Sequence, residues 1–246
     1  MNARTSPVQA GRSASQSSRI IADVRENLFA GRLKPREFLG TEGDIAARFE
    51  VSRIVARDAL RTLEALGVVE IRMGKGGGAR IAEGNPRLFA EALAIQLTLT
   101  GVSAAEIMDA QRAVECLAAE LAAENATAAD IANLNRLLKE AERVIDDVPG
   151  YTRSSREFHL AIAEASHNRV LVVQLISLEH VAWPARNPTL TPQVARRVLD
   201  VHRQLAGLIE MRDGRAARAL MDDHVKMIRA RRVSEQRGRA GMDRCC

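Results

Sequence analysis

The feature that most constrains this 246-residue chain is a pair of short helical segments joined by a tight turn. Thr41 and Asp44 form the pattern of a capping box and predict the start of a first short helix. Ser52 is suited to cap a second helix, which runs to about Leu66 and ends at Gly67. Two helices with so short a connection form a helix-turn-helix.

Further segments extend this unit on both sides. Apolar residues recur at helical spacing from Ser18, and Gly31 ends that segment as a helix C-cap does. Two β-prone stretches, 68–72 and 79–82, flank the glycine-rich run 73–78 and predict a hairpin, or wing. The run lacks the spacing of a nucleotide-binding phosphate loop. Together these segments predict a winged helix-turn-helix.

The rest of the chain is expected to be an all-α bundle. Ser103 with Glu106 and Thr127 with Asp130 repeat the capping-box pattern, each at the start of a long helical segment. Aromatic residues make up only 3% of the sequence, which disfavours a β-sandwich. The predicted fold class is therefore mostly α: an N-terminal winged helix-turn-helix with a small β-hairpin, then a C-terminal bundle of six or seven helices. The further helices are expected at 151–166, 169–181, 194–212 and 215–231.

Composition changes along the chain divide it into four parts. The Ser- and Arg-rich start has no acid before Asp23 and no apolar signal core, which favours a disordered leader over a targeting segment. The sequence Glu83–Pro86 is suited to a linker. The expected divisions are a leader at 1–17, a winged helix-turn-helix domain at 18–83, a helical domain at 84–232, and a flexible basic tail at 233–246.

The net charge of +5 is unevenly distributed. Residues 1–84 carry 14 basic and 10 acidic side chains, residues 225–246 carry 7 and 2, and the segment between them carries 15 and 19. Positive charge on the first domain favours a nucleic-acid partner for that part of the chain. The mildly acidic bundle is expected to have a role other than nucleic-acid binding.

Cysteines and apolar runs indicate the compartment. Cys116, Cys245 and Cys246 cannot form a disulfide framework for a chain of this length, which favours a reducing cytoplasm. No stretch approaches 18 consecutive apolar residues, so a transmembrane helix and a membrane partner are not expected.

Three arginines spaced by four residues lie on the second helix of the pair. Arg53, Arg57 and Arg61 share one face, with Arg53 at the N-terminal end that touches base edges in a recognition helix. Arginine pairs with guanine or grips a phosphate, and Lys75 at the hairpin tip adds a second contact. The alternative is an ordinary solvated helix face.

Residues 18–83 resemble the winged-helix domain of the GntR family of bacterial transcription regulators. The resemblance is carried by Thr41, Glu42, Ile45, Ala46, Phe49–Arg53, Arg57–Leu60, Leu63, Gly67 and Gly74–Gly78. It implies that Ser52, Arg53, Arg57, Gly74 and Lys75 contact double-stranded operator DNA. Two positions depart from the family pattern: Gly43 replaces a DNA-contacting Arg, and Arg36 replaces the Gly that usually follows Pro35. The first departure bears on the operator sequence.

Three of the five histidines are candidate metal ligands. His202 and His224 each lie 11 residues from Asp213, the predicted turn of a helix hairpin, so they are expected at the same level. His159 on another helix would supply a third nitrogen. Three imidazoles suit Zn²⁺ or Ni²⁺ and leave positions open for a carboxylate or water. Alternatively, each is a surface or hydrogen-bonded core histidine.

The second half resembles the ligand-binding domain of the FadR-type (FCD) branch of the same family. The residues concerned are Arg112, Glu115, Phe158, His159, Asn168, His202, Gly214, Ala217 and His224. The resemblance implies a divalent metal held by one Asp and three His, with a small organic acid bound beside it. Ser155 occupies the position of that Asp, which leaves metal binding open, and Glu157 faces elsewhere on the helix. Arg112 and Ser155 are the predicted ligand-binding residues, although Arg112 could instead pair with Glu115 or with another helix.

The predicted function is a homodimeric, ligand-responsive transcription regulator, with repression as the expected effect, and no catalytic residues are assigned. Residues 18–83 are then the expected DNA-binding domain, and residues 84–232 the expected effector-binding and dimerisation domain. One alternative is a metal-dependent hydrolase that uses His159, His202 and His224, although no H-E-x-x-H motif is present. Another is a helical interaction module without an effector, in which the histidines are structural.

Overall fold

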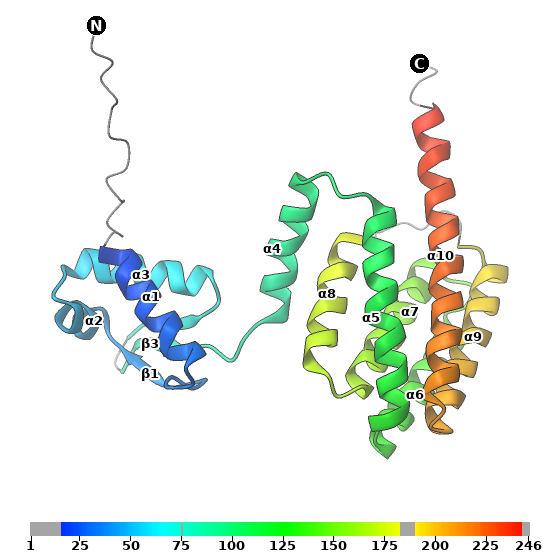
Figure 1. Cartoon of the computed structure of the whole chain (residues 1–246), viewed down its shortest axis with the longest axis horizontal. Coiled ribbons are helices and arrows are strands. Elements are labelled where there is room, and N and C mark those ends of the chain that lie inside the picture. Colours follow the sequence, from blue (N-terminus) through cyan, green and yellow to red (C-terminus); the bar gives the residue numbers. More distant parts are fainter. Residues whose placement is uncertain (1–15, 75, 183–189, 243–246) are drawn as a thin grey trace, which may run out of the picture. The chain divides into compact units, whose positions relative to one another are not determined.

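The computed structural model describes residues 16–74, 76–182 and 190–242. The chain divides into two compact units, Met1–Leu88 and Phe89–Cys246, and Figure 1 labels most of their elements. Lys75, the greater part of the expected leader, Cys245 and Cys246 lie outside the described residues.

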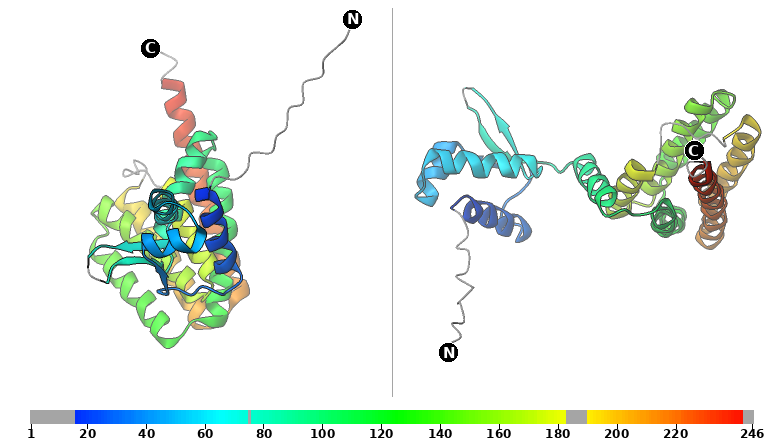
Figure 2. Two further views of the ribbon diagram at one scale, coloured as in Figure 1. Left: turned by 90° about the vertical axis from the view of Figure 1, so that its left-hand side faces the viewer. Right: turned by 90° about the horizontal axis from the view of Figure 1, so that it is seen from above.

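The first unit combines three helices with a small antiparallel sheet. Its elements are α1 (Gln16–Phe29), β1 (Phe38–Gly40), α2 (Glu42–Phe49), α3 (Arg53–Ala65), β2 (Val69–Arg72) and β3 (Gly78–Ile81). Strands β2 and β3 form the predicted hairpin, which Figure 2 shows as a long projecting loop, and β3 also pairs with β1. Strand β1 was not predicted because three residues are too few to show a period.

Side-chain caps define the helix-turn-helix as the sequence predicts. The Thr41 hydroxyl accepts a hydrogen bond from the Asp44 amide at 3.2 Å, and the Asp44 carboxylate accepts one from the Thr41 amide at 2.8 Å. Glu50 then adopts a left-handed conformation with φ 56°, which turns the chain. The Ser52 hydroxyl accepts from the Val55 amide at 3.3 Å and begins α3.

One face of α3 closes the core of this unit. Ala56, Ala59, Leu60 and Leu63 are buried against α1, α2 and the sheet. Leu66, three residues after Leu63, is by contrast 59% exposed. The helix ends at Ala65, so Leu66 no longer follows its periodicity.

We expect Leu60→Ala to lower the free energy of unfolding by about 2–5 kcal/mol, because it removes buried methyl groups and leaves a cavity. Leu66→Ala, the matched control near the end of the same helix, is expected to change it by less than about 0.5 kcal/mol. Denaturant unfolding of the full chain measures both. Equal losses for the two variants would contradict this packing.

The second unit is helical, as predicted, and α4 spans the boundary between the units. The helices are α4 (Pro86–Leu99), α5 (Ala104–Asn125), α6 (Ala128–Arg143), α7 (Val148–Ala165), α8 (Arg169–Ala182), α9 (Pro192–Glu210) and α10 (Gly214–Met242). Both predicted capping boxes are present, at Ser103 and Thr127. Among the described residues, no helix is long and apolar enough to cross a membrane.

Helix α10 differs from the expectation at its C-terminal end. A flexible tail was predicted from residue 233, but the backbone is helical as far as Met242. Arg, Gln, Glu and Ala in this stretch favour a helix, and no proline interrupts it.

Small residues allow α5 and α10 to pack closely along the bundle. Ala119, Ala122 and Ala123 of α5 are fully buried, and a Cβ at Gly214 would lie 3.0 Å from the Glu120 carbonyl oxygen. Figure 1 shows the two helices side by side, with α9 next to α10. This packing places His224 of α10 near residues of α5, α7 and α9.

Candidate functional site

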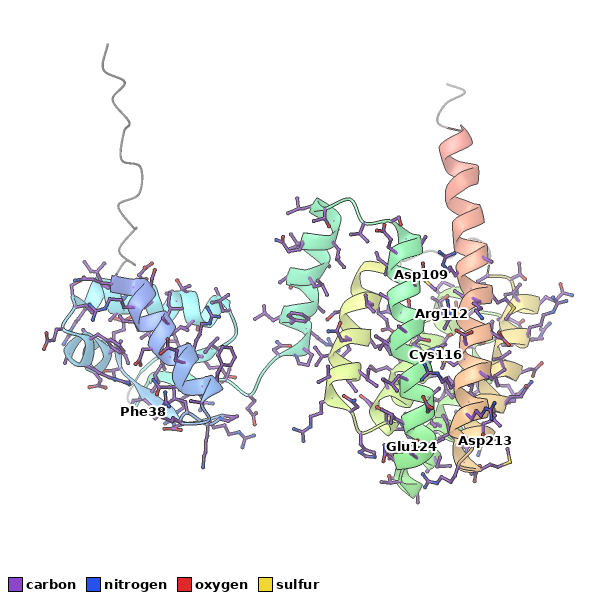
Figure 3. The ribbon with its side chains drawn as sticks, in the orientation of Figure 1. Phe38, Asp109, Arg112, Cys116, Glu124 and Asp213 are labelled. Carbon is purple, nitrogen blue, oxygen red and sulfur yellow. The ribbon has the colours of Figure 1, made fainter. Side chains whose placement is uncertain are left out.

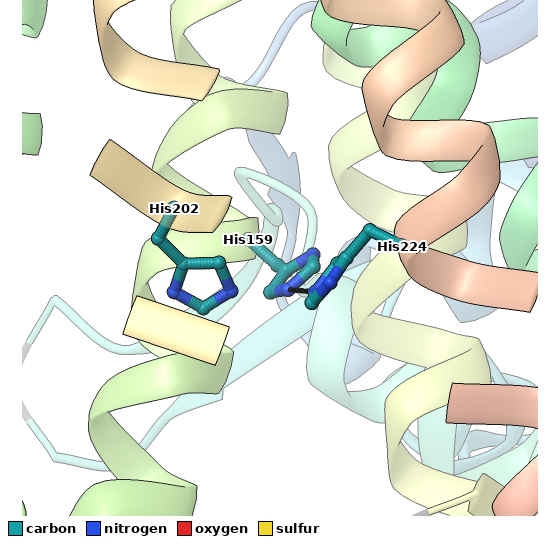
Figure 4. A group of neighbouring side chains, drawn as sticks. All are labelled: His159, His202 and His224. Atoms are coloured by element: carbon teal, nitrogen blue, oxygen red, sulfur yellow. Dashed lines mark hydrogen bonds between the residues drawn. The ribbon is translucent and has the colours of Figure 1, made fainter. Parts of the chain in front are cut away.

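The three predicted histidines meet in the interior of the bundle. His159 comes from α7, His202 from α9 and His224 from α10, and each is at most 5% exposed. One ring nitrogen from each lies within 4.8 Å of the other two, and Figure 4 shows the rings gathered at one level. His202 and His224, which lie equally far along the sequence from the α9–α10 turn, thus meet at the same level, as the sequence predicts.

His202 offers a nitrogen lone pair to this cluster. Burial, followed by the charges of His159 and His224, holds the pKa of His202 well below its usual value, so the ring is neutral. Phe158 stacks on it with ring centroids 4.5 Å apart. Its Nε2 atom is buried and makes no hydrogen bond to the described residues. A buried polar atom of this kind needs a partner, which a water molecule or a metal ion can provide.

Glu115 of α5 orients His159 from the opposite side. The Glu115 carboxylate lies 2.7 Å from His159 Nδ1, and Gln111 donates a hydrogen bond of 2.5 Å to its second oxygen. With Nδ1 engaged, Nε2 of His159 faces His224 Nε2 at 3.3 Å. A carboxylate behind a histidine is a common arrangement in metal sites because it fixes the tautomer and the ring orientation.

The electrostatics of His159 and Glu115 match this contact. Burial disfavours the charged form of each group, but their mutual attraction outweighs it. The pKa of His159 is therefore raised and that of Glu115 lowered. From the sequence, Glu115 is a residue of the FCD resemblance and a possible partner of Arg112, but no role beside His159 is predicted for it. No local pattern could reveal it, because His159 is 44 residues away.

Ser155 lies one turn before His159 on α7 and is buried, so the family Asp has no carboxylate counterpart there. Glu157 is exposed, in line with its predicted orientation. A second buried acid, Glu179 of α8, interacts with the charges of Glu115 and His159. Burial raises the pKa of Glu179 to about 7, and Arg156 approaches its carboxylate to 3.5 Å. Acidic groups from α5 and α8 thus lie near the histidines.

These residues fit a divalent metal. Three imidazoles from three helices form a donor set typical of Zn²⁺, and Glu115 supplies a carboxylate behind one of them. The serine at 155 leaves one position without a protein carboxylate, which water or a ligand oxygen can fill.

Arg112 forms an ion pair outside the histidine cluster, and its predicted part in effector binding stays a prediction. It pairs with Asp222 of α10, which corresponds to the alternative of an ion pair with another helix. Both residues line an open groove of about 560 Å³ between α5 and α10, where Figure 3 labels Arg112 with Asp109 and Cys116. Asp222 is 110 residues away in the sequence, so residue spacing could not identify it as the partner.

The predicted DNA-contacting arginines form an exposed row on α3. Arg57 donates two hydrogen bonds of 2.8 and 2.7 Å to the Glu42 carboxylate of α2, and Arg61 pairs with Glu64 at 2.7 Å. A Cβ at Gly43 would lie 3.6 Å from the Arg53 guanidinium. The structure therefore places Gly43, which departs from the family pattern, beside Arg53.

Gly74 and Ser52 have conformational roles in the same unit. Gly74 has φ +91°, which favours glycine at the hairpin tip. Ser52 caps α3 and is also exposed, so its hydroxyl lies at the N-terminal end of the arginine row. Their contacts with DNA remain predictions.

Comparison with known proteins agrees with both halves of the chain. The family described as "Bacterial regulatory proteins, gntR family" matches residues 16–78, and the FCD domain matches residues 106–227. The Uxu operon transcriptional regulator of Escherichia coli K12 is 30% identical over 220 residues, which cover 85% of this chain and 84% of that protein. The chain belongs to the GntR family. Its second unit is an FCD domain.

Other GntR-family proteins are also similar. The HTH-type transcriptional regulator LutR of Bacillus subtilis is 33% identical over 141 residues, covering 57% of this chain and 64% of LutR. The solved structure titled "Streptococcus agalactiae GntR" shares the fold with a TM-score of 0.62 and 19% identity, and covers 87% of this chain and 99% of that one. This GntR regulator is a ligand-responsive DNA-binding protein rather than an enzyme, and the hydrolase alternative is not supported.

We expect Glu115→Gln to weaken Zn²⁺ binding by about 10–100-fold, because it removes the carboxylate that orients His159. Titration of the full chain against a competing chelator measures the affinity. Glu157→Gln is the matched control, since Glu157 is exposed on the helix that carries His159. Unchanged affinity in a folded Glu115→Gln protein would contradict the assigned role.

Proposed function

We propose that this regulator is a homodimeric repressor whose FCD domain senses a small organic acid through a divalent metal. The supporting observation is the buried cluster of His159, His202 and His224, whose ligand nitrogens lie within 4.8 Å of one another. As a repressor it acts on the chromosome, in the cytoplasm.

DNA binding is assigned to α3 and the β2–β3 wing. The N-terminal half of α3 presents arginines to the major groove, and the glycines of the wing allow its backbone to approach a phosphate. A single recognition helix contacts few base pairs, so two protomers on a two-fold symmetric operator would supply the required specificity.

The three histidines would hold the metal, and Zn²⁺ or Ni²⁺ suits their nitrogen donors. When bound, the metal supplies positive charge and open positions for a carboxylate oxygen. Glu115 orients His159, and burial keeps His202 neutral and able to coordinate. The Ser155 hydroxyl lies one turn from His159, where it is positioned to donate a hydrogen bond to a bound acid or its water.

Regulation would follow from differential affinity. An acid that binds the FCD domain more tightly in one arrangement of the dimer shifts the population toward that arrangement. If this arrangement fits the operator poorly, the acid releases the repressor from DNA, and by linkage DNA weakens acid binding equally.

We expect the full chain to bind a duplex from upstream of its own gene with strong salt dependence. Arg57→Ala should lower this affinity by about tenfold or more, because it removes a guanidinium from the DNA-reading face. Arg136→Ala, on an exposed face of α6, is the matched control. Fluorescence anisotropy over a range of salt concentrations measures both variants. Equal affinities for Arg57→Ala and the unmodified chain would contradict the assigned face.

We expect an organic acid from a screened panel to change operator affinity only in the Zn²⁺-loaded protein. His202→Ala should abolish this response, because it removes one of the three donors. His167→Ala is the matched control, since His167 is exposed and pairs with Asp130. An acid response that survives both chelation and His202→Ala would contradict the proposed sensing site.

A further inference from the structure

The α3 face that is directed away from the core carries one large apolar side chain. Ile54 is the second residue of α3 and is 76% exposed. Successive residues of an α-helix are rotated by about 100°, so the buried side chains of α3 lie on the side of the helix opposite Ile54. These buried residues are Ala56, Ala59, Leu60 and Leu63. Ile54 therefore lies at the middle of the exposed face.

Its neighbours on that face are charged. Arg57 and Arg61 lie three and seven residues after Ile54, and Asp58 lies four after it, so all four side chains share one face of α3. The arginines belong to the row assigned to DNA. An isoleucine in that row contributes no charge and no hydrogen bond, and its exposed surface gains most from an apolar contact.

The major groove offers one apolar group on its base edges. Guanine, cytosine and adenine present hydrogen-bond donors and acceptors, whereas thymine also presents its C5-methyl group. The first residues of a recognition helix are the ones that reach base edges. Ile54 occupies that part of α3, next to Arg53.

We infer that Ile54 is a specificity-determining residue that contacts the C5-methyl group of a thymine in each half of the operator. The inference rests on the proposed docking of α3 in the major groove. It assigns Ile54 a part in base recognition separate from that of the arginines, which contact guanine or phosphate.

A methyl-deletion scan tests this contact. The probe is the tightest-binding duplex selected by the full chain from a randomised library, with each dT replaced in turn by deoxyuridine, which lacks only the methyl group. In the unmodified chain, one position in each half-site should lose about fourfold in affinity on replacement, the worth of one buried methyl. Replacement in both half-sites should lower the affinity about fifteenfold.

The variants Ile54→Ala and Leu66→Ala make the scan specific. Ile54→Ala should bind the dT and deoxyuridine duplexes with equal affinity, and the helix should persist because alanine favours it. Leu66 is an exposed apolar residue that follows the C-terminal end of α3. The Leu66→Ala protein should therefore lose as much affinity as the unmodified chain when dT is replaced by deoxyuridine.

A scan in which no position distinguishes the unmodified chain from Ile54→Ala would overturn the inference while leaving operator binding intact. If Ile54→Ala and Leu66→Ala lost the same affinity on removal of a methyl group that the unmodified chain recognises, the inference would also be overturned, because another residue would then make the contact. Failure to select any specific duplex would overturn the docking proposal together with it.

Discussion

Glu115 and His159 form a buried pair at 2.7 Å in the FCD domain, where every polar group must replace the water that it has lost. Gln111 satisfies the second carboxylate oxygen, and His224 lies beside the other nitrogen of His159. The three imidazoles and this carboxylate belong to four helices, α5, α7, α9 and α10. Their arrangement depends on the close packing of α5 and α10, which the small alanines of α5 allow.

This network leaves His202 Nε2 buried and without a hydrogen bond to the described residues. A core histidine with a purely structural role usually has both nitrogens partnered. A cation among the three rings would engage this atom and would also replace the contact between His159 and His224. The unpartnered His202 atom and the buried Glu115–His159 pair therefore both support the proposed metal site.

Local patterns predicted the elements of this fold well. The capping residues Thr41, Ser52 and Ser103 each act within three residues, so the sequence alone places them. The meeting of His202 and His224 followed from helix geometry around one turn. The sequence could not name Asp222 as the partner of Arg112 or His159 as the partner of Glu115, because these partners lie on helices distant in the sequence. Packing between such helices is a tertiary property that residue spacing does not encode.

The two units respond to different chemistry, which accounts for the uneven charge of the chain. On α3 the arginine row is exposed and partly neutralised by Glu42 and Glu64, so in the proposed complex DNA phosphates would compete with these carboxylates. In the FCD domain the charges of Glu115 and His159 are buried and paired, and salt screens them little. Salt is therefore expected to affect operator binding far more than metal binding.

X-ray absorption spectroscopy at the zinc edge of the Zn²⁺-loaded full chain tests the central claim most directly. The account predicts one bound ion with three imidazole nitrogens at about 2.0–2.1 Å and the remaining positions filled by oxygen. His224→Ala should lower the number of imidazole ligands or abolish binding. A shell that contains sulfur, or one without imidazole, would contradict the assignment of His159, His202 and His224 as the metal centre.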